Sequence, residues 1–376
     1  MKEIKEIFGL EDYQNRIEKA KELMKHEGMD FLFVPISVNL NYLTGIDIDK
    51  TERLTAALIP LKGEPVIICP AFELGRINDL TPFENISVWE EDENPFELTG
   101  DIIQNDYEGD PSIGIESKTW FSEYSSLFEQ LENADFRNAS NILENLRLIK
   151  SKKEINSIKK AIQIIGEARD ELLENIEKGM TQTQLTEMLR DYATKKRPGE
   201  ELSGIINFGK NTSEPHGASK DIKIEEGTVI MIDTGVKVNG YVSDITRTTV
   251  YGDPPEDFEN IFNTLLSAQN EAFETIKPGV QAQEVDRAAR RVIDRAGYGK
   301  YFTHRLGHGI GLEVHERPWI AEGNKQRLKE GMTFTVEPGI YLPERFGVRI
   351  EENIVVTENG CECLSDQPDN FQALRA

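Results

Sequence analysis

Residues 226–235 read Glu226-Gly227-Thr228-Val229-Ile230-Met231-Ile232-Asp233-Thr234-Gly235, and residues 330–339 read Glu330-Gly331-Met332-Thr333-Phe334-Thr335-Val336-Glu337-Pro338-Gly339. Each segment is an apolar run that begins after a Glu-Gly pair and ends at a carboxylate. Upstream, Lys178-Gly179-Met180 and Pro278-Gly279-Val280 each precede a helical pattern. A repeat at an offset of about 100 residues indicates a duplicated unit with pseudo-two-fold symmetry and a site between its halves. Chance similarity of helix and strand patterns is the alternative.

The segments before this repeated region follow a different pattern. Apolar spacing predicts a helix from Asp12 to Gly28, and short apolar or β-branched runs predict strands at residues 31–35, 55–61, 65–69, 86–89 and 112–115. Strands that alternate with helical or turn-rich stretches are typical of an α/β domain, here a mixed sheet with flanking helices.

A capping box marks the start of the second pattern. Ser151 is followed three residues later by Glu154, which predicts the first turn of a long amphipathic helix. Its buried face would consist of Ile155, Ile158, Ile162, Ile165 and Ile176, and Gly179 would end it. We therefore expect two domains, residues 1–148 and residues 149–376.

The charge, the apolar runs and the cysteine content of the sequence exclude several classes of protein. The chain has 376 residues, with 43 Lys and Arg against 67 Asp and Glu, for a net charge of −24. This charge repels a phosphate backbone, so nucleic acid is not an expected partner. Because the sequence contains neither a long apolar run nor a secretory signal, we expect no membrane association and a cytoplasmic location. Three cysteines are too few for a disulfide framework or a four-thiolate zinc site, and we expect them to be reduced.

Two aspartates flank a predicted hairpin. Asn239-Gly240 is a strong signal for a two-residue turn, and it pairs Val238 with Tyr241 and Asp233 with Thr246. Asp244 would then oppose Gly235, so that Asp233 and Asp244 become diagonal neighbours on one face. Two carboxylates this close repel each other unless a proton or a cation lies between them. Two solvated strand aspartates are the alternative.

Three further residues have side chains suited to chemistry. His308 lies between glycines in Gly307-His308-Gly309, where a ligand can approach closely, although such a segment can also be a simple turn. Glu337 ends an apolar strand, where its charge needs compensation. Glu351 lies two residues after Arg349, so period-two alternation places both on one face of a strand; an ordinary ion pair on a wet face is the alternative.

Together these residues supply four carboxylates and one imidazole. Oxygen-rich ligand sets with one nitrogen suit manganese, cobalt or iron, and bridging carboxylates suit two ions about 3.5 to 4 Å apart. The set therefore predicts a dinuclear hydrolase site.

Several motifs resemble those of a known family of metallopeptidases. The sequence closely resembles the Xaa-Pro peptidases, prolidase and aminopeptidase P, of the pita-bread family, with a looser likeness to the creatinase-type N-terminal domain. The motifs are Asn41-Tyr42-Leu43-Thr44-Gly45, Asp233-Thr234-Gly235, Gly240-Tyr241-Val242-Ser243-Asp244-Ile245-Thr246-Arg247-Thr248, Gly307-His308-Gly309-Ile310-Gly311-Leu312-Glu313-Val314-His315-Glu316, Thr335-Val336-Glu337-Pro338-Gly339-Ile340-Tyr341 and Gly347-Val348-Arg349-Ile350-Glu351-Glu352. The resemblance implies a creatinase-type α/β domain at residues 1–148, an α+β pita-bread catalytic domain at residues 149–376, and a homodimer.

The resemblance also implies roles for individual residues. It makes the metal ligands Asp233, Asp244, His308, Glu337 and Glu351, and it matches His216, His315 and Arg349 to the family's non-ligand site residues. The implied reaction is hydrolysis of the bond before proline in a di- or oligopeptide. A hydroxide shared by two divalent ions would attack while Glu337 shuttles the proton. Manganese is expected first, with cobalt, iron or zinc as alternatives.

One departure concerns recognition of the substrate. Some prolidases have a basic residue directly after the proline that follows His315, whereas here Pro318 is followed by Trp319, and the nearby cation in the sequence is Arg317. The residue that binds the substrate carboxylate therefore stays open. Other reactions on the same scaffold, such as ectoine-type hydrolysis or a dimethylsulfoniopropionate-type lyase reaction, are alternatives, as is a non-catalytic peptide-binding protein.

Overall fold

The computed structural model describes residues 7–196, 202–214 and 222–374. The chain divides into two compact units, Met1–Arg147 and Leu148–Ala376. Among the described residues, none of the helices combines the length and the hydropathy needed to cross a bilayer. All three cysteines are free thiols.

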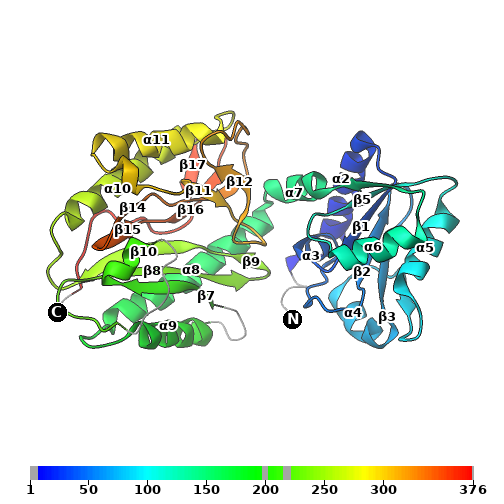
Figure 1. Cartoon of the computed structure of the whole chain (residues 1–376), viewed down its shortest axis with the longest axis horizontal. Helices are drawn as coiled ribbons and strands as arrows, with labels where there is room; N and C mark the ends of the chain where they lie inside the picture. The colour runs from blue at the N-terminus through cyan, green and yellow to red at the C-terminus, as the bar shows by residue number, and fades with distance from the viewer. Residues whose placement is uncertain (1–6, 197–201, 215–221, 375–376) are drawn as a thin grey trace. The chain divides into compact units, whose positions relative to one another are not determined.

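The first unit is built on one six-stranded mixed sheet. In spatial order its strands are β4 (Ile86–Trp89), β3 (Val66–Pro70), β2 (Ala56–Pro60), β1 (Phe31–Pro35), β5 (Ser112–Ile115) and β6 (Asp135–Asn138). Strand β2 is antiparallel to β1 and β3, and the other neighbours are parallel. The helices are α2 (Leu10–Glu27), α3 (Val38–Thr44), α4 (Leu74–Leu80), α5 (Pro95–Asp106), α6 (Phe121–Gln130) and α7 (Ser140–Leu148). The predicted mixed sheet with flanking helices is confirmed (Figure 1).

Local sequence accounts for most of these elements. Helix α2 ends at Glu27 and is capped by Gly28, whose left-handed φ of 67° would strain a residue with a side chain. All five residues of β1 are buried, as expected for a central strand covered on both faces. Five of the six strands were predicted, and β6 was missed because its burial pattern is largely exposed and it forms an edge of the sheet.

The second unit consists of two similar halves. The first contains α8 (Lys152–Glu174), α9 (Gln182–Lys196), β7 (Leu202–Phe208), β8 (Thr228–Val238), β9 (Tyr241–Val242) and β10 (Ile245–Tyr251). The second contains α10 (Phe258–Thr275), α11 (Ala282–Arg295), β11 (Gly307–Gly309), β12 (Glu316–Ile320), β13 (Thr333–Val336), β14 (Gly339–Leu342), β15 (Phe346–Arg349), β16 (Glu352–Val356) and β17 (Cys361–Cys363). Figure 1 shows α10 and α11 on one side of the strands and α8 and α9 on the other.

The same backbone contacts recur in both halves. The amide of Gly179 donates to the carbonyl of Ile224 at 2.8 Å, and the amide of Gly279 donates to Leu328 at the same distance. Isolated bridges join Thr181 to Lys223 in the first half and Gln281 to Arg327 in the second. Because these contacts repeat at offsets of 100 and 104 residues, the predicted internal repeat is a structural one.

Two local predictions are wrong. The capping box of Ser151 and Glu154 is present, but α8 ends at Glu174, and Ile176 and Gly179 lie in the turn that follows. The predicted continuous strand through residues 348–354 is interrupted, because β15 ends at Arg349 in a two-stranded sheet and β16 begins at Glu352 in a five-stranded one. Glu351 therefore lies in the connection between two sheets, not on a shared strand face with Arg349.

Candidate active site

The hairpin places the first two carboxylates. Its register pairs Val238 with Tyr241 and Asp233 with Thr246, as predicted from the turn. Asp244 lies between β9 and β10, and its peptide group is held by Asn353 of β16, whose Oδ1 accepts from the Asp244 amide at 3.2 Å. The hairpin and the second half of the unit therefore meet at Asp244.

The glycines around His308 allow close packing. A Cβ on Gly307 would lie 1.9 Å from the carbonyl oxygen of Thr335, and one on Gly309 would lie 2.1 Å from that of Arg317. Glycine is therefore required on both sides of the histidine, where β11 runs between β12 and β13. The His308 side chain is buried, with 3% of its surface exposed.

Glu337 and Glu351 each lie in a short connection between two strands, Glu337 after β13 and Glu351 before β16. Glu337 follows β13, its amide donates to the carbonyl of Leu306 at 2.8 Å, and its Oε1 accepts from Thr335 at 3.3 Å. The amide of Glu351 donates to the carbonyl of Thr246 at 3.1 Å, and its Oε2 accepts from the Thr246 hydroxyl at 2.7 Å. Backbone and side-chain hydrogen bonds thus fix both carboxylates.

The structure brings all five predicted ligands to one cavity. Its volume is about 380 Å³, and it is lined by Asp233, Asp244, His304, Arg305, His308, His315, Glu337, Arg349 and Glu351. Nε2 of His308 lies 3.2 Å from Oε1 of Glu337 and 3.7 Å from Oδ2 of Asp244. One ligand atom from each of Asp244, His308 and Glu351 lies within 4.8 Å of the others.

The tautomer of His308 suits a cation. Nδ1 lies 3.2 Å from the carbonyl oxygen of Gly309, which can only accept, so Nδ1 carries the proton of the neutral ring. Nε2 then presents a lone pair to the oxygens of Glu337 and Asp244, which are acceptors as well. Acceptors that face one another need a shared proton or a shared cation, and this donor set fits divalent metal ions.

The electrostatics of the cavity agree with this geometry. Burial raises the pKa of Glu337 to about 7. Burial, followed by the charges of Glu337 and Asp233, raises the pKa of Glu351 to about 8. Burial and the neighbouring acids raise the pKa of Asp244 well above its ordinary value, whereas burial lowers the pKa of His308. Without a cation, Glu337 and Glu351 would thus be protonated to a large extent near neutral pH.

Arg349 contacts one of the predicted ligands directly and another through a hydroxyl group. Its Nη2 donates to Oδ2 of Asp233, and its Nη1 donates to the Tyr341 hydroxyl at 2.9 Å. Its Nε donates to the Thr246 hydroxyl at 3.0 Å, which in turn donates to Glu351. The predicted placement of Arg349 and Glu351 on one strand face is therefore wrong, and the Thr246 hydroxyl connects the two side chains.

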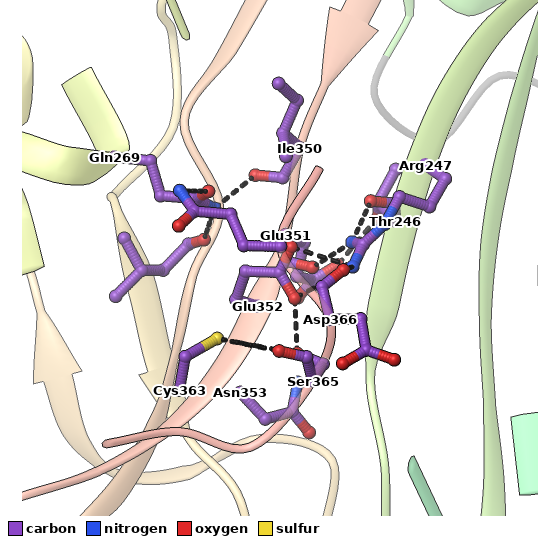
Figure 2. Close-up of polar contacts among 12 residues, drawn as sticks. Thr246, Arg247, Gln269, Ile350, Glu351, Glu352, Asn353, Cys363, Ser365 and Asp366 are labelled. Carbon is purple, nitrogen blue, oxygen red and sulfur yellow. Dashed lines mark hydrogen bonds and ion pairs between the residues drawn. The ribbon is translucent and has the colours of Figure 1, made fainter. Parts of the chain in front are cut away.

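A second layer of polar side chains lies behind Glu351 (Figure 2). Arg247 donates to the carbonyls of Thr246 and Glu351 and to the buried carboxylate of Glu352. From α10, Nε2 of Gln269 donates to the carbonyls of Val336 at 2.9 Å and Ile350 at 3.2 Å. These carbonyls directly precede Glu337 and Glu351, so Gln269 joins the two segments that supply the acids.

His315 and His216 are the other two residues predicted for the site. The exposed ring of His315 lies 4.3 Å from that of His308, centroid to centroid, at the mouth of the cavity. His216 falls outside the described residues. Three cavity or network residues were not predicted: His304, Tyr341 and Arg305. Tyr341 lay within a quoted motif, whereas His304 and Arg305 lay just before another and no pattern in the sequence singled them out.

Comparisons with known proteins agree over nearly the whole chain. Residues 156–358 match the model of metallopeptidase family M24, and residues 16–149 match that of the creatinase/prolidase N-terminal domain. The Xaa-Pro dipeptidase of Pyrococcus furiosus is 35% identical over 94% of this chain and 98% of its own. The structures of Mycobacterium ulcerans dipeptidase PepE and Thermococcus sibiricus prolidase each give a TM-score of 0.90 at 31% identity, covering 98% of this chain and 100% of theirs.

Proposed function

We propose, because this chain belongs to metallopeptidase family M24, that it hydrolyses the peptide bond before proline in small peptides at a site that binds two divalent ions. The family makes the protein a metallopeptidase, as the sequence resemblance predicted. The curated relative named Xaa-Pro dipeptidase supports the proline specificity. The convergence of His308 Nε2 on the carboxylates of Glu337 and Asp244 is the observation that carries the proposal.

Five residues would hold the ions: Asp233, Asp244, His308, Glu337 and Glu351. Divalent ions at this position would act as Lewis acids and make a water molecule nucleophilic near neutral pH. Manganese is the first candidate because four of the five ligands supply oxygen; cobalt, iron and zinc are the others to test.

Glu337 would move the proton that cleavage requires. The nitrogen of an Xaa-Pro bond carries no hydrogen and must gain one as the bond breaks. Oε1 of Glu337 lies 3.2 Å from Nε2 of His308, so the carboxylate stands beside the position of the attacking water, where it can take up a proton and pass it to the leaving nitrogen. Its hydrogen bond from Thr335 keeps the carboxylate oriented toward His308.

His315 and Arg349 would assist from the cavity wall. His315 is exposed beside His308, where its ring can donate to the carbonyl oxygen of the substrate. Arg349 is bonded to Asp233 and, through Thr246, to Glu351, so its role would be to position two ligands. His216 keeps its proposed role through the resemblance alone. A cytoplasmic homodimer is part of the same proposal.

The test uses protein that has been stripped of metal and then reloaded. Activity toward Ala-Pro and Ala-Ala is measured without metal and with manganese, cobalt, iron or zinc. We expect turnover of Ala-Pro only after metal is added, and little turnover of Ala-Ala. Equal turnover by metal-free protein would reject the metal site, and equal rates on both dipeptides would reject the proline specificity.

A further inference from the structure

The cavity contains a second arginine, Arg305, whose surroundings differ from those of Arg349. Its guanidinium carbon lies 4.3 Å from the ring centroid of Trp319, which pairs with His308 across the ladder of β11 and β12. The neighbouring His304 fixes its backbone, because Nδ1 of His304 lies 2.7 Å from the Arg305 carbonyl oxygen. Backbone and side chain of Arg305 are thus each held by a neighbour.

The hydrogen-bond donors of Arg305 are unused. Across residues 7–196, 202–214 and 222–374, the structure records no acceptor for its guanidinium, although the side chain is half-buried. Arg349, by contrast, gives all three of its nitrogens to Thr246, Tyr341 and Asp233. Of the two arginines that line the cavity, Arg305 is therefore the one with donors available to a ligand.

The charge environment places this group beside the reacting centre. Arg305 and Glu337 both line the cavity. Burial lowers the pKa of Arg305, and the carboxylate of Glu337 partly offsets that effect. Cations bound by the acidic residues would neutralise their charge and leave the guanidinium without a counter-ion. An anionic group of the substrate would then supply one.

We propose that Arg305, whose guanidinium lies over the ring of Trp319, binds the C-terminal carboxylate of the substrate and so selects dipeptides that have a free carboxyl group. This inference rests on the proposed function. Stacking on an aromatic ring fixes the plane of a guanidinium and leaves its N–H edge free for two parallel bonds to a carboxylate. Trp319 occupies the position directly after Pro318 where some related enzymes have a basic residue, and Arg305 would supply the missing charge from the segment just before β11.

The experiment compares two substrates that differ only in this group. Manganese-loaded protein is assayed on Ala-Pro and on Ala-Pro amide, and kcat/KM is measured for wild type, Arg305→Gln and Arg305→Lys. Arg317→Gln is the matched control, because Arg317 lies on β12 two residues before Trp319 but does not line the cavity. Metal content and melting temperature of each variant establish that it is folded and loaded.

We expect wild type to prefer the free dipeptide. Arg305→Gln should lower kcat/KM for Ala-Pro by about 10- to 100-fold, mainly through KM, and change the amide by less than about 2-fold. Arg305→Lys should retain part of the preference, because it keeps the charge but not the two parallel bonds. Arg317→Gln should keep the wild-type ratio.

Other results would overturn the inference. A wild type that cleaves both compounds equally well, or an Arg305→Gln variant that loses activity on both to the same extent, would show that Arg305 does not bind the carboxylate, while the proposed hydrolysis would stand. If Arg305→Gln loses metal or unfolds, the Arg305→Lys variant provides the test. An Arg305→Lys variant with the wild-type preference for the dipeptide and the wild-type KM would contradict binding of the carboxylate by two parallel bonds. Failure of wild type to cleave either compound would reject the proposed function itself.

Discussion

The hydroxyl of Thr246 lies 2.7 Å from Oε2 of Glu351 and donates a hydrogen bond to it. The Thr246 hydroxyl oxygen itself accepts a hydrogen bond from Nε of Arg349 at 3.0 Å. One buried hydroxyl thus orients a proposed metal ligand and connects it to the arginine that holds Asp233. Since such outer contacts fix the direction of ligand lone pairs, metal affinity should depend on Thr246.

Thr246→Val removes the hydroxyl and keeps the shape of the side chain. We expect manganese affinity to fall by about 10-fold or more, because Glu351 loses its donor. Isothermal titration of metal-free protein would measure it. Thr249→Val is the matched control, since Thr249 lies on the same strand but donates to the carbonyl of Gln372. Equal affinities for both variants would show that Thr246 does not support the site.

His308 and His315 are neighbours with different proposed roles. His308→Ala should abolish binding of at least one metal ion and lower kcat by more than about 100-fold, because a buried ligand is lost. His315→Ala should retain metal and lower kcat by about 100-fold through weaker stabilisation of the reacting carbonyl. Elemental analysis and kinetics on the same samples separate the two effects. Loss of metal from the His315 variant would make that residue a ligand instead.

Gln269 couples the stability of the unit to its metal site. Gln269→Leu leaves the carbonyls of Val336 and Ile350 without this donor, and we expect the free energy of unfolding of metal-free protein to fall by about 2 kcal/mol. Metal affinity should fall with it, because Glu337 and Glu351 follow those carbonyls directly. Denaturant unfolding and metal titration are the measurements. Gln163→Leu, an exposed glutamine on α8, is the control, and a similar loss there would exclude a specific role for Gln269.

The sequence predicted those parts of the site that depend on local patterns. The turn at Asn239-Gly240 determined the pairing of Asp233 with Thr246, because a two-residue loop leaves one register available. The internal repeat indicated that two halves would bring their acids to one place, and the structure brings them to one cavity. The family and both domain types also followed from motifs and are confirmed by the matches.

Contacts between distant segments could not be predicted in this way. Period-two alternation treated residues 348–354 as one strand, but the chain passes from one sheet to another there, so Arg349 meets Asp233 instead of Glu351. Gln269 lies on a helix, where the periodicity of apolar residues indicates that the position is buried but does not indicate which groups the side chain contacts. Arg305 lies just before β11 and contacts Trp319 of β12, and this contact depends on the pairing of the two strands, which no local pattern describes.

The metal-free protein should become less stable as pH rises. In the folded state, burial raises the pKa of Glu337 to about 7 and that of Glu351 to about 8, whereas both lie near 4.5 in the unfolded chain. Between these values the folded state binds more protons than the unfolded state. The contribution of these two groups to the free energy of unfolding is therefore fully present below about pH 4.5 and is lost as the pH rises to about 8. We expect the melting temperature to drop by at least about 5 °C between pH 5.5 and pH 8.5.

General repulsion in a chain of net charge −24 contributes to the same trend, so matched variants are needed to isolate the site. Glu351→Gln should flatten the pH dependence of the melting temperature, because it removes the group with the pKa of about 8. Glu358→Gln, which removes an exposed carboxylate, should leave the slope unchanged. Saturating manganese should reverse the trend, because metal competes with protons for the same oxygens and binds more tightly as pH rises. A slope that is the same in all four samples would show that these buried carboxyl groups do not titrate together at a metal site.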